Sequence, residues 1–516
     1  MRSRLCELVR IPRAALGALA LVTCAAATSS FAQNAPVDSL GLRNGDTAVA
    51  AADGALSPPV APVIAPPSSD LAPLAPAPNP PPKKKPPPKL KLGAYPGAQR
   101  LGLRGGPPQL SDGQTPPPTI AAIPPAPPHR RAPVDDKPFD PVGVSVGDLK
   151  LTPYVEEDVG FSSNPGQTAG GQKGSAFETT EGGFGLQSDW SRSDLHGSFK
   201  GGYTDYFGAP VDDAPYGSGS LDGRLDVTRD LSFDAEGRFN VSTQTLTSLG
   251  VNSASATTSN PLVSTYGATL GGVQKFGLLS LGLHGAIDHT SYEDATQGGV
   301  VTLPLSTDDY NDLGLKARAS YEISPAISPF LELGLDARRY DDGVDYAGFA
   351  RNSNGVSGSA GATLAFTRQL TGEASVGYGE RAYQDARLPN MHSPLINASL
   401  IWSATPLTTV TAKAQTSLAD TITPGASGSV QRVYTIDAAH ALTRSFTLGV
   451  SAGYTSDDYV GISQRDSTTT LGARAEYHVS RDVVVKASAT RQQYESNLPN
   501  SNYVSNVFLL GLRLQR

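Results

Sequence analysis

The chain has 516 residues, of which 54 are glycine and two are methionine, and its formal net charge is −7. A mildly acidic chain lacks the basic face that nucleic-acid binding requires, so we expect no nucleic-acid partner. Beyond the N-terminus no apolar run approaches the roughly 18 residues of a membrane-spanning helix, which excludes a helical membrane protein. Abundant glycine without long apolar runs favours an all-β fold.

Residues 1–32 are predicted to be a signal peptide. Four arginines beginning with Arg2 give a positive start, Ala14–Ala27 is a short apolar stretch, and Ala32 ends a cleavage site of small residues. The two cysteines of the chain, Cys6 and Cys24, both lie in this segment. The mature chain is therefore expected to hold no disulfide and no cysteine metal site. Lipid attachment at Cys24 is the alternative to cleavage after Ala32.

Residues 33–139 are predicted to be a disordered periplasmic segment rich in proline, alanine and lysine. The stretch from Pro58 to Pro141 holds 27 of the 42 prolines. Such a composition buries too little apolar surface to offset the entropy of ordering the chain. Its basic centre, Pro80–Lys91, favours the extended polyproline II conformation. Two roles stay open for this segment: a flexible spacer, or an arm that binds the cell wall or an inner-membrane partner.

Residues 140–516 are predicted to form a β-barrel in the outer membrane. Apolar or small residues alternate with charged ones along many segments, as Leu231, Phe233 and Ala235 do with Asp234 and Glu236. A strand points successive side chains to opposite faces. A wall between lipid and a wet lumen needs this pattern, so the expected fold class is an all-β, antiparallel transmembrane β-barrel of about 18 strands (16–18).

Turn signals divide this region into strands. Eight short turns can be counted, five of them with an arginine, as in Thr228-Arg229-Asp230. Together with nine longer connections they join eighteen strands and place both chain ends on the short-turn side, which in bacterial barrels faces the periplasm. The nine longer, polar connections lie around 162–176, 208–215, 244–262, 290–308, 341–354, 384–393, 419–429, 456–466 and 495–502.

Aromatic residues are predicted to form two belts at the two membrane interfaces, where amphipathic rings favour the headgroup level. The belt near the short turns comprises Trp190, Phe233, Phe276, Phe366, Trp402 and Phe446. The belt at the loop ends of the strands comprises Tyr203, Tyr292, Tyr340, Tyr383, Tyr454 and Tyr494.

Charged residues on the alternate face of the strands are candidates for lining the lumen. With Lys200, Lys413 and Lys486 included, ten basic residues stand against nine acidic ones on this face, so no strong ion preference is expected. Half or more of them are expected to pair across strands and to serve only in solvating the wall. The candidate lumen-facing residues are Arg224, Arg238, Lys316, Arg318, Glu332, Asp336, Arg338, Arg474, Glu476 and Arg513.

No catalytic, cofactor-binding or metal site is expected. Hydrolysis needs a histidine beside a nucleophile or an acid, and the pairs worth naming are His392 with Ser393 and His289 with Glu293. A histidine beside a serine in a polar loop usually has no catalytic role. Paired aspartates are interpreted as solvated loop residues, because a calcium site needs about six to eight well-placed oxygens. These pairs stand at 212–213, 308–309, 341–342 and 457–458.

Two segments carry a resemblance to a known family. One is LTPY at 151–154 running to VGFSSN at 159–164, and the other is the hairpin ALTRSFTLGVSAGY at 441–454. On these, the region from about Leu151 to Arg516 resembles the β-barrel porin family of proteobacterial outer membranes (porin-2-like outer-membrane β-barrels). The resemblance implies a porin, or an outer-membrane component of exopolysaccharide export, and it implies no catalytic residue.

The expected function is a porin-like channel for the passive transport of small solutes. Two alternatives stay open: an exopolysaccharide export channel with an aromatic sugar track in its lumen, and a structural or adhesion barrel with a plugged lumen. Expected partners are outer-membrane lipid, lipopolysaccharide and the barrel-assembly machinery, which reads a terminal strand. That strand alternates correctly from Phe508 to Leu514 but ends at Arg516 instead of an aromatic residue, which weakens its insertion signal.

Overall fold

The computed structural model describes residues 139–170, 173–208, 214–245, 260–297, 300–367 and 369–516. The predicted signal peptide, residues 1–32, and all of the predicted proline-rich segment, 33–139, except Phe139, lie outside these residues. Within the described part of the chain, no helix has the length and apolar character to span a bilayer.

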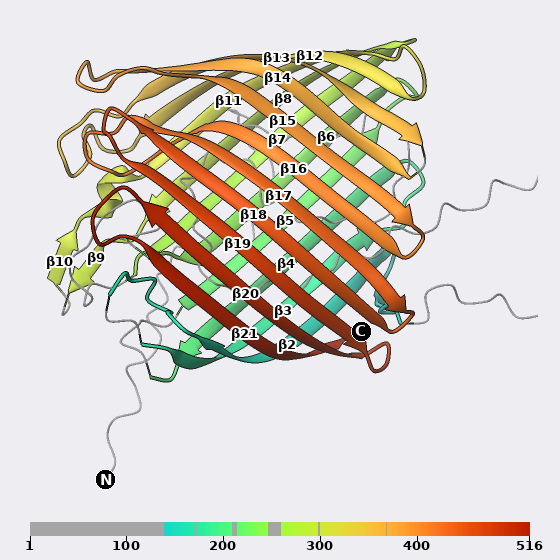
Figure 1. The fold of residues 1–516 in the computed structure, drawn as a ribbon. Helices are drawn as coiled ribbons and strands as arrows, with labels where there is room; N and C mark the ends of the chain where they lie inside the picture. The colour runs from blue at the N-terminus through green and yellow to red at the C-terminus, as the bar shows by residue number, and fades with distance from the viewer. Residues whose placement is uncertain (1–138, 171–172, 209–213, 246–259, 298–299, 368) are drawn as a thin grey trace, which may run out of the picture. The chain divides into compact units, whose positions relative to one another are not determined.

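Eighteen antiparallel strands form one closed barrel (Figure 1). Each strand pairs with its neighbours in the chain, and β2 pairs with β21 from Tyr154↔Gln515 to Ser162↔Val507, which closes the sheet. The predicted fold class and strand number are confirmed. The strands are β2 (Leu149–Ser162), β3 (Ser175–Ser188), β4 (Ser193–Tyr206), β5 (Ala214–Asp226), β6 (Leu231–Thr243), β7 (Leu262–Phe276), β8 (Leu279–Tyr292), β11 (Tyr310–Tyr321), β12 (Ile327–Tyr340), β13 (Ser353–Thr367), β14 (Leu370–Tyr383), β15 (Met391–Thr405), β16 (Thr408–Ala419), β17 (Gly428–Thr443), β18 (Phe446–Val460), β19 (Arg465–His478), β20 (Val483–Ser496) and β21 (Tyr503–Gln515).

Four short elements accompany the barrel. β1 (Val144–Val146) pairs with the first residues of β2. The connection from β8 to β11 contains a hairpin of β9 (Ala295–Gln297) with β10 (Val300–Leu303), and then the single-turn helix η1 (Leu305–Asp308). At the other end of the barrel the ring of Phe139 lies 6.3 Å from that of His478. The described chain therefore enters the barrel at the short-turn end, where β21 also finishes.

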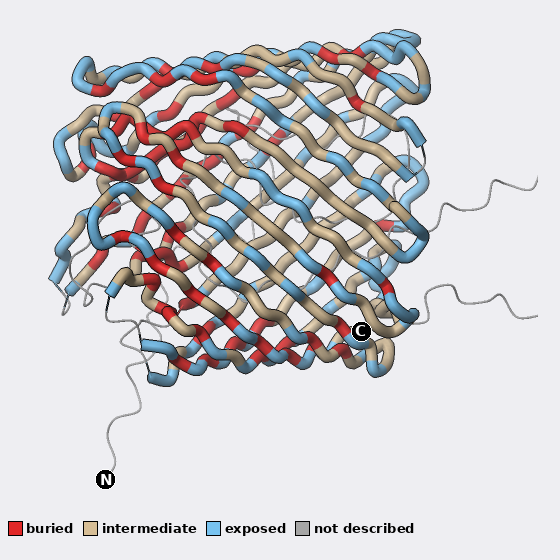
Figure 2. The backbone as a smooth tube through the Cα atoms, viewed as in Figure 1, coloured by how far each residue is buried: buried red, intermediate tan, exposed pale blue. Residues whose placement is uncertain are grey.

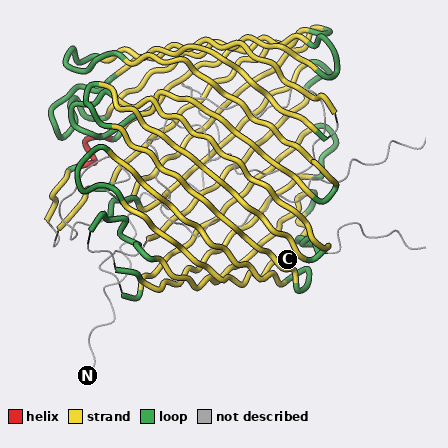
Figure 3. The backbone as a smooth tube through the Cα atoms, viewed as in Figure 1, coloured by secondary structure: helices red, strands yellow, loops and turns green. Residues whose placement is uncertain are grey.

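The two ends of the barrel differ as predicted, with tight turns at one end and longer connections at the other (Figure 3). One predicted loop, 456–466, is shorter in the structure, because β18 continues to Val460 and β19 starts at Arg465. Asp457 and Asp458 therefore lie in a strand and not in a loop, which corrects the interpretation of that aspartate pair.

The wall has an apolar outer face and a polar inner face. On β12 the side chains of Leu331, Leu333 and Leu335 are 63%, 65% and 54% exposed, while Glu332 between them lies on the inner face and pairs with Lys316. Buried residues gather toward the long-loop end, where the barrel is most filled (Figure 2). Apolar side chains that face water would cost free energy, so the outer face requires lipid.

The predicted aromatic belts need a correction at the loop end. Tyr203 and Tyr454 are exposed on the outer face, as are Trp190 and Trp402 near the short turns. Four other predicted belt residues instead point inward, where their hydroxyls are buried under loops. These are Tyr292, Tyr340, Tyr383 and Tyr494. The sequence placed them correctly at strand ends but not on the correct face, because inward-folded loops provide polar partners such as Asp420 for Tyr340.

Candidate functional site

The connection between β16 and β17, residues 420–427, folds into the barrel, and we call it the mouth loop. Its first residue, Asp420, forms an ion pair of 2.9 Å with Arg338 on β12. The Tyr340 hydroxyl, also on β12, donates to the Asp420 carboxylate at 2.6 Å. β12 lies four strands away from β16 in the sheet order, so these contacts can form only across the interior.

The mouth loop reaches still farther across the barrel. Ile422 is 1% exposed and packs in an apolar cluster with Val263 of β7, Leu305 of η1 and Tyr310 of β11. β7 is separated from β16 by seven steps around an eighteen-strand barrel, which is close to the opposite side. The loop therefore spans much of the mouth and narrows the route through the lumen.

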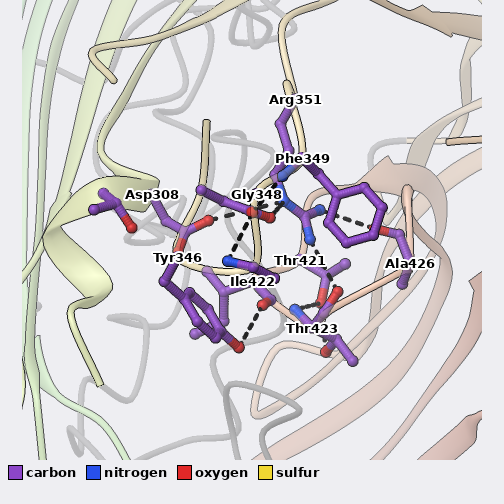
Figure 4. Close-up of polar contacts among 12 residues, drawn as sticks. Asp308, Tyr346, Gly348, Phe349, Arg351, Thr421, Ile422, Thr423 and Ala426 are labelled. Carbon is purple, nitrogen blue, oxygen red and sulfur yellow. Dashed lines mark hydrogen bonds and ion pairs between the residues drawn. The ribbon is translucent and has the colours of Figure 1, made fainter. Parts of the chain in front are cut away.

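Arg351, in the connection between β12 and β13, holds the mouth loop in place (Figure 4). Its guanidinium donates to the carbonyl oxygens of Ala426 at 2.8 Å and Thr423 at 2.9 Å. Its third donor, Nε, donates to the Asp345 carboxylate at 2.6 Å. Arg351 is only 1% exposed, so these are charge-assisted hydrogen bonds in a desolvated setting and are stronger than their surface equivalents.

Asp308, the last residue of η1, joins the same cluster without a hydrogen bond. Its carboxylate is fully buried, both of its oxygens lack a hydrogen-bond partner, and its nearest cation atom, Nε of Arg351, is 3.9 Å away. Burial raises the pKa of Asp308 to about 8; Arg351 opposes the rise, while the carboxylates of Asp345 and Asp420 add to it. We call Asp308, Asp345, Arg351, Thr423 and Ala426 the Arg351 cluster.

Neighbouring loops support the mouth loop from the outside. The Ser427 hydroxyl donates to the carbonyl of Pro389 at 2.7 Å, which links it to the β14–β15 connection. In that same connection Asp385 accepts hydrogen bonds from Arg387 and from the backbone of Ala350, and these bonds hold the pKa of Asp385 below its usual range. Three long connections are thus cross-linked at the mouth.

A second connection folds inward on the other side of the barrel. Gln167, between β2 and β3, is 3% exposed. Its amide oxygen accepts from the Thr245 hydroxyl at 3.1 Å and from the Tyr503 hydroxyl at 3.0 Å. Thr245 follows β6 and Tyr503 begins β21, five strand steps apart. Two loops therefore narrow the mouth from two sides.

The ten candidate lumen-facing residues all lie opposite the exposed apolar face. Nine of them pair with an oppositely charged residue, and Glu476 lies beside the ring of His478, which is charged only when protonated. Their pairs are spread around the wall, so they do not converge on one catalytic or binding centre. The ion pairs are Arg224–Asp226 (3.0 Å), Arg238–Asp288 (2.6 Å), Lys316–Glu332 (3.1 Å), Arg318–Glu373 (2.6 Å), Arg338–Asp312 (2.8 Å), Arg381–Asp336, Arg474–Asp437 (2.5 Å), His478–Glu476 (3.1 Å) and Arg513–Glu156 (2.5 Å).

In two places the ion pairs share a residue and form a larger cluster. Arg318 lies between Glu373 and Glu332, and Lys316 shares Glu332 with it. At the seam that closes the barrel, Glu156 of β2 accepts from both Arg513 of β21 and Lys486 of β20. The first group fixes neighbouring strands of the wall, and the second fixes its closure.

The pairs considered for catalysis are not assembled. His392 is exposed on the outer face of β15, while Ser393 next to it is 3% exposed and points inward. His289 contacts Asn311 through its ring nitrogen at 3.2 Å. Among the residues that the structure describes, no group of three or more histidine, cysteine, aspartate or glutamate side chains could hold a metal ion.

Sequence reasoning did not single out Arg351, and it interpreted Asp308 as a solvated loop residue. Both are fully buried in the structure, because connections that look polar and exposed fold into the lumen and bury one another. The only local signal is an arginine in a connection that otherwise carries acids, such as Asp345. That signal does not predict a partner seventy residues away.

The comparisons with known proteins agree with this architecture. A family model described as "Putative beta-barrel porin 2" matches residues 137–516, while no curated protein matches the chain. Similar solved structures include the outer membrane protein OpdK from Pseudomonas aeruginosa (11% identity, TM-score 0.38) and a BenF-like porin from Pseudomonas fluorescens Pf-5 (10% identity, TM-score 0.38), each alignment covering 72% of this chain and 99% of the other. TM-scores below 0.5 mark only a distant likeness. The chain belongs to the family described as "Putative beta-barrel porin 2", and its family and fold are those of an outer-membrane channel rather than of an enzyme.

Proposed function

We propose that this barrel lets small solutes pass passively across the outer membrane, through a lumen whose outer mouth is narrowed by the mouth loop. The observation that carries the proposal is that residues 420–427 cross the interior of the barrel. Arg338 of the wall holds this loop at Asp420, and Arg351 of the β12–β13 connection holds it at Thr423 and Ala426. A loop held by buried ion pairs keeps a defined cross-section, which is what a size-limited pore requires.

The inner wall supports passage of water and solutes. Charged residues line it on many strands and most are paired with each other, so the wall is hydrated without a dominant field of one sign. Thr435 shows that the lumen is open in places, because it is exposed although it lies on the inner face, between the outward Tyr434 and Ile436.

Single-channel recording of the purified full chain in planar bilayers tests the proposal. Steady ohmic openings of one main size are expected. Arg351→Gln is expected to raise the conductance, since the mouth loop loses its anchor, while Arg465→Gln, an arginine with a 79% exposed side chain outside the cluster, leaves it unchanged. A wild-type chain that inserts as a heat-modifiable barrel yet stays silent would overturn the proposal in favour of a plugged structural or adhesion barrel.

A second candidate, export of an exopolysaccharide, is favoured by one specific observation. Tyrosine rings lie on the inner wall: Tyr154 and Tyr216 both donate to the Glu181 carboxylate, at 2.8 Å and 2.9 Å, and both are only partly buried. Tyrosine faces are surfaces on which sugar rings can stack. Block of the ionic current by long, but not by short, soluble oligosaccharides would support this candidate over a general pore.

We also propose three sets of partners. The exposed apolar face is suited to outer-membrane lipid and, at the long-loop end, to lipopolysaccharide. The strand β21 alternates as the barrel-assembly machinery requires, with outward Phe508, Leu510, Leu512 and Leu514. For residues 33–139, the basic proline-rich sequence supports binding to the cell wall or to an inner-membrane partner. Co-sedimentation of the full chain with purified peptidoglycan tests this last proposal: binding that persists after residues 80–91 are replaced by glycine and serine would contradict it.

A further inference from the structure

The cations of the inner wall fall into two groups. Most are neutralised by a carboxylate within ion-pair distance, as Arg318 is by Glu373 and Arg238 by Asp288. Such a pair presents little net field to a passing ion, because the two charges cancel at a distance. These residues therefore build the wall and contribute little to ion selectivity.

Lys200 of β4 and Lys413 of β16 belong to the second group and lie away from the short-turn ends of the strands, which is where the other two unpaired inner-face lysines of the described strands, Lys150 and Lys275, are found. Lys200 and Lys413 both lie on the inner face within their strands, and neither has a hydrogen-bond or ion-pair partner in the described structure. Their cross-strand neighbours are small or hydroxylic: Lys200 is flanked by Gly183 and Ser218, and Lys413 by Ser399 and Thr435. Both lysines are partly exposed, and Thr435 beside Lys413 is exposed, so the lysine side chains are in contact with lumen water.

These two lysines lie almost opposite each other. Going around the barrel, β4 and β16 are separated by eight steps through β2 and by ten steps through β11. Two free positive charges on opposite walls act together on an ion in the lumen between them, whereas two neighbouring charges would act on one wall only.

The acids without a cation partner are shielded by comparison. Glu181 is 5% exposed and accepts hydrogen bonds from two tyrosines. Asp457 is 4% exposed and accepts from Ser429 and Gln431. Asp158 and Asp466 are likewise buried, at 3% and 7%. These carboxylates point into the wall, where protein groups stand between them and a solute.

The negative charge of one inner-face acid, Asp222, opposes the effect of the lysines on a solute. Asp222 of β5 is partly exposed on the inner face and forms no ion pair within the described residues, although the charge of Arg238 lies near enough to act on it.

Within the described strands, four inner-face lysines lack an ion pair: Lys200 and Lys413, and Lys150 and Lys275 at the short-turn ends of β2 and β7. Against them stand Asp222, and Asp194 and Asp234, whose only ionic partners are histidines. Counted over all inner-face residues, basic and acidic side chains are nearly equal in number. Counted only over accessible side chains without a carboxylate or cation partner, the basic ones are in excess.

We propose that Lys200 and Lys413 make the lumen favour small anionic solutes, such as those that carry a carboxylate or a phosphate. The proposal rests on the channel function above and adds the class of solute to it. The prediction of no strong ion preference from counting residues is refined here, because pairing removes most of the counted charges from the field that a solute meets.

The experiment measures the reversal potential of the purified full chain in a planar bilayer that separates two KCl concentrations. Wild type is expected to show a chloride-to-potassium permeability ratio above one. In Lys200→Gln/Lys413→Gln the ratio is expected to fall about four-fold for each lysine, because one unit charge at roughly 8 Å in water favours an anion about two-fold and disfavours a cation about two-fold. Low ionic strength is needed because about 0.1 M salt screens charges beyond roughly 10 Å.

Two controls make the result specific. Arg229→Gln/Arg444→Gln removes the same amount of charge from exposed short turns and is expected to leave the ratio unchanged. Asp222→Asn removes the opposing accessible acid and is expected to raise it. Repeating the measurement with potassium acetate and potassium phosphate separates carboxylate from phosphate preference.

The outcomes distinguish this inference from the function on which it rests. If wild type shows no conductance, the channel function itself fails. If wild type conducts but the double lysine variant has the wild-type reversal potential, or changes it no more than the turn variant does, the channel stands and the anion preference is overturned. Heat-modifiable gel mobility of every variant confirms that the barrels compared are folded.

Discussion

The guanidinium of Arg351 donates to the carbonyl oxygen of Thr423 at 2.9 Å, so a residue that follows β12 holds a loop that follows β16. An arginine fork that binds two backbone carbonyls and one carboxylate is a rigid clamp, because each of its three nitrogens donates in a fixed direction of the planar group. The cross-section of the channel is therefore set by side chains in loops as well as by the number of strands.

Replacing this clamp should loosen the mouth loop without unfolding the barrel. Arg351→Gln leaves Asp345 buried without its cation, and breaking a buried pair costs about 3–5 kcal/mol. That cost falls on the loop conformation, since Arg351 contacts no strand residue through its guanidinium hydrogen bonds. We expect faster proteolysis within residues 420–427, measured by mass spectrometry of the fragments. Proteolysis at the wild-type rate would contradict the role assigned to Arg351.

The mouth should also respond to pH through Asp308. Burial raises the pKa of Asp308 to about 8 in the closed arrangement, against about 3.9 for an exposed aspartate. The closed arrangement, in which the mouth loop narrows the lumen, thus binds the proton more tightly than an arrangement in which the loop is displaced. Its stability is greatest below about pH 4, falls as pH rises between about 4 and about 8, and stays low above that.

The single-channel conductance in bilayers is therefore expected to increase as pH is raised from 5 to 9, because a charged Asp308 destabilises the arrangement in which the mouth loop narrows the lumen. Asp308→Asn, which stays neutral, is expected to remove this dependence. Asp341→Asn is the control, since the Asp341 carboxylate is exposed and accepts a hydrogen bond from Asn311, outside the Arg351 cluster. The same pH dependence in Asp308→Asn as in wild type would assign the effect to another group.

Closure of the barrel should depend on Glu156. Its carboxylate is 4% exposed and lies within 2.8 Å of Lys486 and 2.5 Å of Arg513. Glu156→Gln leaves two cations with no full negative charge at the β2–β21 seam, at a cost of about 3–5 kcal/mol. We expect a lower temperature for the loss of heat-modifiable mobility. Glu157→Gln, an exposed neighbour on the outer face of β2, should not lower it.

The sequence allows prediction of those features that depend on residues close together in the chain. Alternation along Leu331, Glu332 and Leu333 is set by strand geometry, so the fold class, the eighteen strands and the two unlike ends could be predicted from residue order. The face of Tyr292 and Tyr340 could not, because it depends on loops that fold over them. The pairing of Arg351 with Thr423 likewise depends on a contact between connections far apart in the chain, for which no periodic pattern exists.

The lipid-facing wall gives the last prediction, through Leu333 at the middle of β12. Its side chain is 65% exposed on the outer face, so in the membrane it meets hydrocarbon. An arginine at the midplane of a barrel wall costs about 2–4 kcal/mol, and the cost falls toward about 0–1 kcal/mol near the interfaces. Leu333→Arg should therefore lower the unfolding midpoint in urea, measured by tryptophan fluorescence in lipid vesicles.

Val344→Arg is the matched control, since Val344 is 51% exposed but lies in the connection after β12, beyond the wall. An arginine there remains in water and should leave the midpoint unchanged. Equal midpoints for the two variants would mean that the exposed face of β12 does not meet lipid. A lower midpoint for Leu333→Arg alone would show that the exposed leucines of the wall contact lipid, because an arginine costs free energy in hydrocarbon but not in water.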